Sequence, residues 1–128
     1  MIWPDSLKDI EMDIKISNDK SVGEIQREFS AAFPYLKVEF FKKKESDVRS
    51  KGQLIPEKTI LGLIRPIDQS PELDINPDRT VHDLERDFLE KHGLSVQIFR
   101  KSGNLWIETT LTDSWSLGRQ NKEGEQMS

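Results

Sequence analysis

The sequence predicts an α+β protein in which two β-α-β repeats form a ferredoxin-like sheet with two helices on one face. An internal repeat, alternating apolar residues and helix-capping residues support this prediction. Residues 16–29 match residues 75–88 at an offset of 59 (75 − 16), and residues 36–43 match residues 94–101 at an offset of 58 (94 − 36). An added C-terminal β-hairpin strand and a short helix complete the fold. A different mixed sheet with an extra C-terminal helix is the alternative.

The repeats lie in one predicted domain that spans all 128 residues, a length typical of single domains. Hydrophobic residues make up 34% and charged residues 33% of the chain. This composition is polar for a globular protein but still allows a core. The predicted parts are a first repeat over 12–43, a linker over 44–70, a second repeat with its hairpin strand over 72–112, and a polar tail over 119–128.

The first repeat begins with a strand over residues 12–16, where apolar and polar residues alternate. Ser21 starts a helix, because its hydroxyl can accept hydrogen bonds from the first turn and Glu24 completes a capping box. Pro34 ends the helix, and residues 36–43 alternate again as a strand. The apolar face of this helix comprises Val22, Ile25, Phe29 and Phe33.

The second repeat follows the same order, with a short strand over residues 73–75. Thr80 caps the helix with Asp83 three residues later, and Gly93 ends it because glycine readily takes the left-handed conformation. Residues 94–101 form the next strand. The apolar face of this helix comprises Val81, Leu84, Phe88 and Leu89.

A two-residue turn at Ser102-Gly103 predicts a hairpin, with residues 104–112 as the returning strand. Ser116 then caps a short helix. Leu61-Gly62 recurs as Leu117-Gly118, which indicates that residues 59–64 are a diverged counterpart of residues 115–118. The cross-strand pairs implied by the turn are Lys101 with Asn104, Phe99 with Trp106, and Gln97 with Glu108.

Alternation along the strands assigns two faces to the sheet. Aliphatic side chains point to the helices, and the other side is called here the helix-free face. A Phe and a Lys recur at matching positions of both repeats on that face. The candidate binding residues are Phe41, Lys43, Gln97, Phe99, Lys101, Trp106 and Glu108.

Exposed aromatic residues on this face would suit a protein partner, a homodimer or stacked nucleic-acid bases. Alternatively, residues 44–70 or the C-terminal segment fold over the face and bury it. The net charge of −4, Glu39 and Glu108 on the same face, and the lack of an RNA-recognition signature argue against nucleic acid.

Composition excludes several other kinds of site. The chain has no cysteine, which rules out disulfides and thiolate sites. Its two histidines, His82 and His92, lie about 15 Å apart along one helix, too far to share a metal. We therefore predict no cofactor, no metal and no catalytic residues, and we expect His92 to interact with the helix dipole. The start of the sequence has no signal-peptide pattern and no apolar run could span a membrane, which favours a cytoplasmic protein without membrane contact.

Residues 96–110 and 112–117, which contain the runs FRKSGNLWIETT and TDSWSL, resemble a small bacterial protein family of uncharacterised function. The helix from Thr80 to Phe88 fits the same pattern. The resemblance implies no activity and no cofactor. It implies either a specific site or a structural role, in which Trp115 plugs the sheet and Asp113 caps a turn. The residues concerned are Trp106, Glu108, Thr110, Asp113 and Trp115.

These observations predict a non-enzymatic protein-interaction or accessory module that uses the helix-free face, with self-association through that face as one form. A nucleic-acid-binding module on the same face is the second hypothesis. A small enzyme that uses Glu108 and Asp113 as paired carboxylates is the third.

Overall fold

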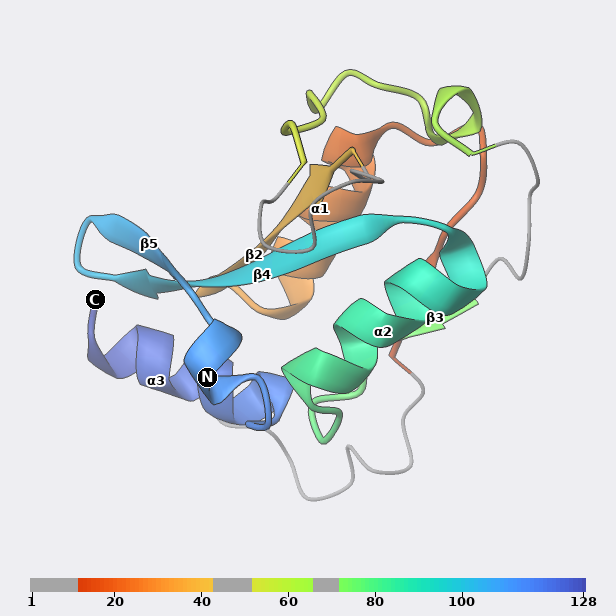
Figure 1. Cartoon of the computed structure of the whole chain (residues 1–128). Coiled ribbons are helices and arrows are strands. Elements are labelled where there is room, and N and C mark those ends of the chain that lie inside the picture. Colours follow the sequence, from red (N-terminus) through yellow and green to blue (C-terminus); the bar gives the residue numbers. More distant parts are fainter. Residues whose placement is uncertain (1–11, 43–51, 66–71) are drawn as a thin grey trace.

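The computed structural model describes residues 12–42, 52–65 and 72–128 (Figure 1). Within these ranges the protein is a mixed α+β structure with two antiparallel sheets. The elements, in chain order, are β1 (Asp13–Lys15), α1 (Val22–Ala32), β2 (Leu36–Phe41), the 3-10 helix η2 (Leu61–Leu63), β3 (Glu72–Asp74), α2 (Val81–His92), β4 (Ser95–Ser102), β5 (Leu105–Glu108), the 3-10 helix η3 (Thr110–Thr112) and α3 (Leu117–Gln126).

The strand pairing differs from the expected ferredoxin-like sheet. β1 pairs only with β3, and the second sheet has the order β2-β4-β5. Each of the first four strands therefore pairs with its counterpart from the other repeat rather than joining one common sheet. Antiparallel pairing of counterparts places their apolar residues on one side, and it is slightly more stable per residue than parallel pairing.

The register shows an approximate two-fold axis between the repeats. Ile14 pairs with Leu73, its own counterpart at the offset of 59 (73 − 14). Glu39 likewise pairs with Gln97, its counterpart at the offset of 58 (97 − 39). A residue can face its own counterpart in an antiparallel ladder only at the two-fold axis, so the axis passes between β1 and β3 in one sheet and between β2 and β4 in the other.

The two Leu-Gly segments make equivalent backbone hydrogen bonds. Leu61 N–H donates to the Lys20 carbonyl at 2.9 Å, and Leu117 N–H donates to the Arg79 carbonyl at 2.8 Å. The next residue in each segment, Gly62 or Gly118, donates to the loop before the helix of its repeat. Each repeat thus consists of strand, helix, strand and a returning segment that closes the helix N-terminus.

The predicted helix caps are confirmed. Ser21 Oγ accepts a hydrogen bond from Glu24 N–H at 3.1 Å, and Thr80 Oγ1 accepts one from Asp83 N–H at 3.1 Å. Gly93 ends α2 in the left-handed conformation with φ of 64°. Ser116 caps α3 by accepting from Arg119 N–H at 3.1 Å.

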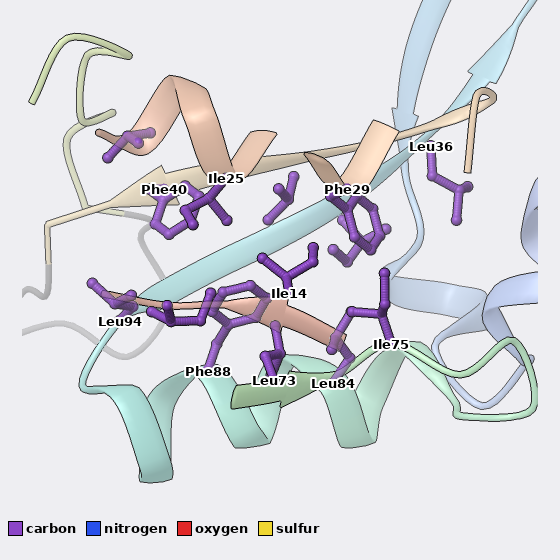
Figure 2. Packing of buried hydrophobic residues seen from close by; sticks show 14 of the residues in the cluster. Ile14, Ile25, Phe29, Leu36, Phe40, Leu73, Ile75, Leu84, Phe88 and Leu94 are labelled. Atoms are coloured by element: carbon purple, nitrogen blue, oxygen red, sulfur yellow. The ribbon is translucent and has the colours of Figure 1, made fainter. Parts of the chain in front are cut away.

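The core lies between the helices and the two sheets, where side chains from α1, α2 and the strands point into one cluster (Figure 2). Phe40 of β2 meets Phe88 of α2 edge to face, with ring centroids 5.7 Å apart. Each large apolar side chain buried here contributes about 1.5–3 kcal/mol. The fully buried apolar residues of α1 and α2 are Val22, Ile25 and Phe29 of α1 and Val81, Leu84 and Phe88 of α2.

Residues 119–128 are not the predicted polar tail, since most of them belong to α3. The helix is polar in composition but docks through buried polar groups. Gln120 Oε1 accepts from Arg100 Nη1 at 2.7 Å, and Asn121 Oδ1 accepts from Tyr35 N–H at 2.8 Å. Gly124 lets the helix approach the Tyr35 backbone closely. These hydrogen bonds, rather than an apolar stripe, hold the end of the chain.

The hairpin turn is Gly103-Asn104, one residue later than predicted, and Gly103 has φ of 59°. Ser102 therefore faces Leu105, Lys101 faces Trp106, and Phe99 faces Glu108. Each β4 residue is matched with a β5 residue two positions further along than expected. A shift of two residues keeps every side chain on its predicted face, because side-chain direction alternates with a period of two.

Candidate functional site

The centre of the candidate site is a lysine between two aromatic rings on the helix-free face. Lys37 Nζ lies 5.4 Å from the ring centroid of Phe99 and 5.2 Å from that of Trp106. Both distances are within the range of a cation–π interaction. The Trp106 side chain remains 38% exposed, so the cluster is accessible from solvent.

Strand register brings these three residues together. Lys37 faces Phe99 across β2 and β4, and Trp106 lies on β5 diagonal to Phe99. Lys37 also lies 3.4 Å from Glu39 Oε1. The sequence analysis placed Lys37 on this face without selecting it, because the contact depends on the β2–β4 register and no local pattern encodes that register.

The structure places most of the candidate binding residues where they were predicted. Strand alternation puts all those of β4 and β5 on the helix-free face, namely Gln97, Phe99, Lys101, Trp106 and Glu108. Phe41 also belongs to this face but faces Ser95, four residue steps from Lys37, which is about 13 Å along the strand. The two matching phenylalanines therefore do not form one cluster. Lys43 lies outside the described residues.

Neither of the described segments that were considered as covers hides Trp106. Residues 53–55 run beside the edge of β2, where Ile55 N–H donates to the Phe40 carbonyl at 2.7 Å. The C-terminal helix contacts the helix side of the sheet, and its Met127 carbonyl accepts from Gly103 N–H at 2.9 Å at the hairpin tip. Figure 1 shows the β4–β5 hairpin extending past α1 and α2, with the C-terminal end of α3 near its tip.

The carboxylates of the enzyme hypothesis have different surroundings. Glu108 lies on β5 opposite Phe99. Asp113 lies beyond η3, where its Oδ2 is 3.4 Å from His82 Nδ1 and its carbonyl accepts from His82 N–H at 2.8 Å. The backbone and side chain of Asp113 thus both contact the N-terminus of α2.

Trp115 lies apart from the aromatic cluster. Its ring stacks on the guanidinium of Arg119 at 3.7 Å, with Arg100 at 5.5 Å on the same ring. These contacts tie the start of α3 to β4. The residues of the C-terminal motif therefore divide into a structural group around Trp115 and an accessible group around Trp106.

His92 is buried rather than exposed at the helix end. Only 1% of its surface is accessible, and neither ring nitrogen has a hydrogen-bond partner in the described part of the chain. Burial lowers the pKa of His92 below 6.5, and the charge of Arg65 lowers it further. This environment disfavours the charged imidazole on which the predicted dipole interaction depends.

Arg65 joins the segment between the repeats to both of them. Its guanidinium donates to Asn18 Oδ1 at 2.6 Å, to the Ile16 carbonyl at 2.9 Å and to the His92 carbonyl at 3.1 Å. The side chain is almost completely buried. Such a buried cation is retained only where hydrogen bonds compensate its lost hydration. Arg65 is thus a structural residue.

Within residues 12–42, 52–65 and 72–128, no group of three or more histidine or acidic side chains could hold a metal ion. In the same ranges no helix has the length and apolar content needed to cross a membrane.

Comparisons of the chain with protein-family models, with curated proteins and with solved structures found no match. The resemblance of the C-terminal motif to a small bacterial family therefore stays a prediction. The functional argument rests on the geometry of the helix-free face.

Proposed function

We propose that this chain is a non-enzymatic protein-interaction or accessory module that binds a partner protein through the helix-free face around Lys37, Phe99 and Trp106. The observation that supports the proposal is a lysine held between two aromatic rings on a sheet face, with one of the rings, Trp106, 38% exposed. Aromatic side chains of this kind are enriched at protein interfaces and dominate their binding energy.

The charges around the aromatic pair favour a protein partner. Lys37 and Lys101 are matched by Glu39 and Glu108 on the same face, and the whole chain carries a net charge of −4. A nucleic acid would bring its phosphates close to these carboxylates, which is unfavourable. A protein surface with both signs of charge would instead complement this face. The acidic composition and the lack of cysteine suit action in the cytoplasm.

A pull-down from cell lysate tests the proposal. The wild-type chain is compared with the double variant Phe99→Ser/Trp106→Ser and with the control Leu63→Ser, which removes an exposed leucine from η2. We expect the double variant to lose the captured protein and the control to keep it. Equal capture by all three chains would contradict the proposal.

Base stacking remains the second candidate, because Lys37 lies beside two accessible rings. Salt distinguishes the two. Binding to a single-stranded oligonucleotide through phosphates should weaken strongly between about 50 and 200 mM salt, whereas capture of a protein through apolar contacts should persist. Fluorescence anisotropy with a labelled oligonucleotide, read at both salt concentrations, measures this.

A further inference from the structure

The outer strand β5 is the most apolar exposed strand among those described. All four residues of β5 are exposed, including Leu105 at 69% and Ile107 at 36%. β5 ends the order β2-β4-β5, so within residues 12–42, 52–65 and 72–128 one side of its backbone has no neighbouring strand. Natural proteins usually protect such an edge with lysine, proline or a bulge. The sequence Leu-Trp-Ile-Glu contains neither lysine nor proline.

Hydrogen bonding within the hairpin shows which backbone groups face outward. Thr109 N–H donates to the Ile98 carbonyl at 3.3 Å. In an antiparallel ladder the bonded positions alternate, so Leu105 and Ile107 are the other β5 residues that bond to β4. The N–H and C=O of Trp106 then point away from the sheet. They form a donor and an acceptor at the centre of the edge.

The opposite edge of this sheet is already occupied. Its backbone accepts hydrogen bonds from two α1 side chains and from the segment between the repeats. These bonds are Gln26 Nε2 to the Val38 carbonyl at 2.8 Å, Ser30 Oγ to the Leu36 carbonyl at 2.9 Å, and Ile55 N–H to the Phe40 carbonyl at 2.7 Å.

We propose that β5 pairs antiparallel with β5 of a second copy of this chain, about a two-fold axis through Trp106. The pairing joins two three-stranded sheets into one of six strands. It uses the edge of β5, so it goes beyond the proposed function of the helix-free face and does not rest on it. Because the β2 edge is occupied, the assembly closes at two copies rather than continuing into a fibre.

Side-chain direction selects this register. Residues opposite each other across strands point to the same face, and Trp106 points to the other face from Leu105 and Ile107. Pairing Trp106 with Trp106 of the second copy satisfies this rule and makes the two-fold pair a hydrogen-bonded one. Leu105 then faces Ile107 of the second copy, twice by symmetry, so every exposed apolar residue of β5 meets another.

Two other registers also keep side chains of the same face opposite each other, but each of them opposes less compatible residues. A two-fold axis at Leu105 would place Ile107 against the Gly103 turn, and one at Ile107 would place Trp106 against Glu108. In the proposed register Glu108 faces the neutral Asn104, so no like charges oppose each other on the edge. Self-complementarity in one register supports a second copy of the chain as the partner.

The predicted dimer is weak, since strands of four residues bury a small area. Interfaces of this size lie at the low end for specific complexes, and we expect a dissociation constant on the order of 100 µM. Sedimentation velocity on the wild-type chain, from about 10 µM to about 1 mM, should show a monomer at the lower end and a dimer at the upper end. A monomer throughout would overturn the proposal.

Cross-linking tests the register directly, because the natural chain has no cysteine. A hydrogen-bonded antiparallel pair has Cα atoms about 5.5 Å apart, which is within the range for a disulfide. Trp106→Cys should therefore oxidise to a covalent dimer at least ten-fold faster than Leu105→Cys. The control position is more exposed than Trp106, so random collisions would favour it. Equal rates, or a faster control, would overturn the proposed axis.

A further pair of variants separates this inference from the proposed function. Ile107→Lys places a charge in the β5 interface, so it should abolish the dimer while protein capture by the helix-free face persists. Phe99→Ser should abolish capture while the dimer persists. Loss of capture with Ile107→Lys would mean that the partner protein uses the β5 edge, and it would overturn the choice of a second copy.

Discussion

Replacing Gly124 by alanine should destabilise the protein, although alanine is the better helix former. In an exposed helix this change would stabilise by about 1 kcal/mol. Here a Cβ at position 124 would lie 2.8 Å from Tyr35 Cβ and 3.1 Å from both the Tyr35 carbonyl oxygen and Arg100 Cγ. Tyr35 Cβ is attached directly to the backbone and cannot move alone. Overpacking of this kind costs about 1–3 kcal/mol, so we expect a net loss of about 1 kcal/mol.

Urea unfolding followed by tryptophan fluorescence measures this change. For a chain of this size, a loss of 1 kcal/mol lowers the melting temperature by about 4 °C. The control is Lys122→Ala on the exposed side of α3, which should stay within about 0.5 kcal/mol of wild type. If Gly124→Ala were as stable as wild type or more stable, α3 would not pack closely against Tyr35, and the account of its docking would be refuted.

Three further predictions concern the buried His92, the buried Arg65 and the two helix caps. Because burial lowers the pKa of His92, the unfolded chain binds a proton more readily, so stability should fall as pH drops below about 6.5; His92→Met should flatten this dependence in denaturation curves at pH 5–7, and the exposed His82→Gln should not. Arg65→Met leaves three oxygens without their donor and should cost about 3 kcal/mol in urea unfolding, and a loss below about 1 kcal/mol would contradict the structural role. Ser21→Ala and Thr80→Ala should each cost about 1 kcal/mol through the lost cap, with Ser102→Ala unchanged by the same measurement.

Equivalent residues of the two repeats make different hydrogen bonds at the outer edges of β2 and β4. Gln26 of α1 donates to the carbonyl of Val38, whereas its counterpart Glu85 (26 + 59) accepts from the N–H of Ile98 at 2.9 Å. Both residues bind the outer edge of the strand that follows their helix. The edge beyond β2 is completed by the segment between the repeats, and the edge beyond β4 by β5. The two rings of the aromatic cluster, Phe99 and Trp106, and the outer strand β5 belong to the second repeat.

Local patterns were sufficient for most elements and for the faces, but not for the end of the chain, where β5 ends at Glu108 instead of residue 112 and α3 extends through the predicted polar tail. The caps at Ser21, Thr80 and Ser116 and the stop at Gly93 were predicted from adjacent residues, because a cap is a hydrogen bond within one turn. The helix-free face was also predicted, because side-chain direction alternates along a strand whatever the strand pairs with. The recurrence of Leu-Gly identified equivalent segments before any contact was known.

Long-range pairing was decided only by the tertiary structure. The choice of β3 as the partner of β1, the contact of Lys37 with Phe99 and Trp106, and the docking of α3 all join residues far apart in sequence. Alternation states which way a side chain points and leaves its partner open, since many registers bury the same apolar residues. The sequence by itself thus determined the type of most elements and the faces of the strands, and tertiary packing determined which elements pair and pack together.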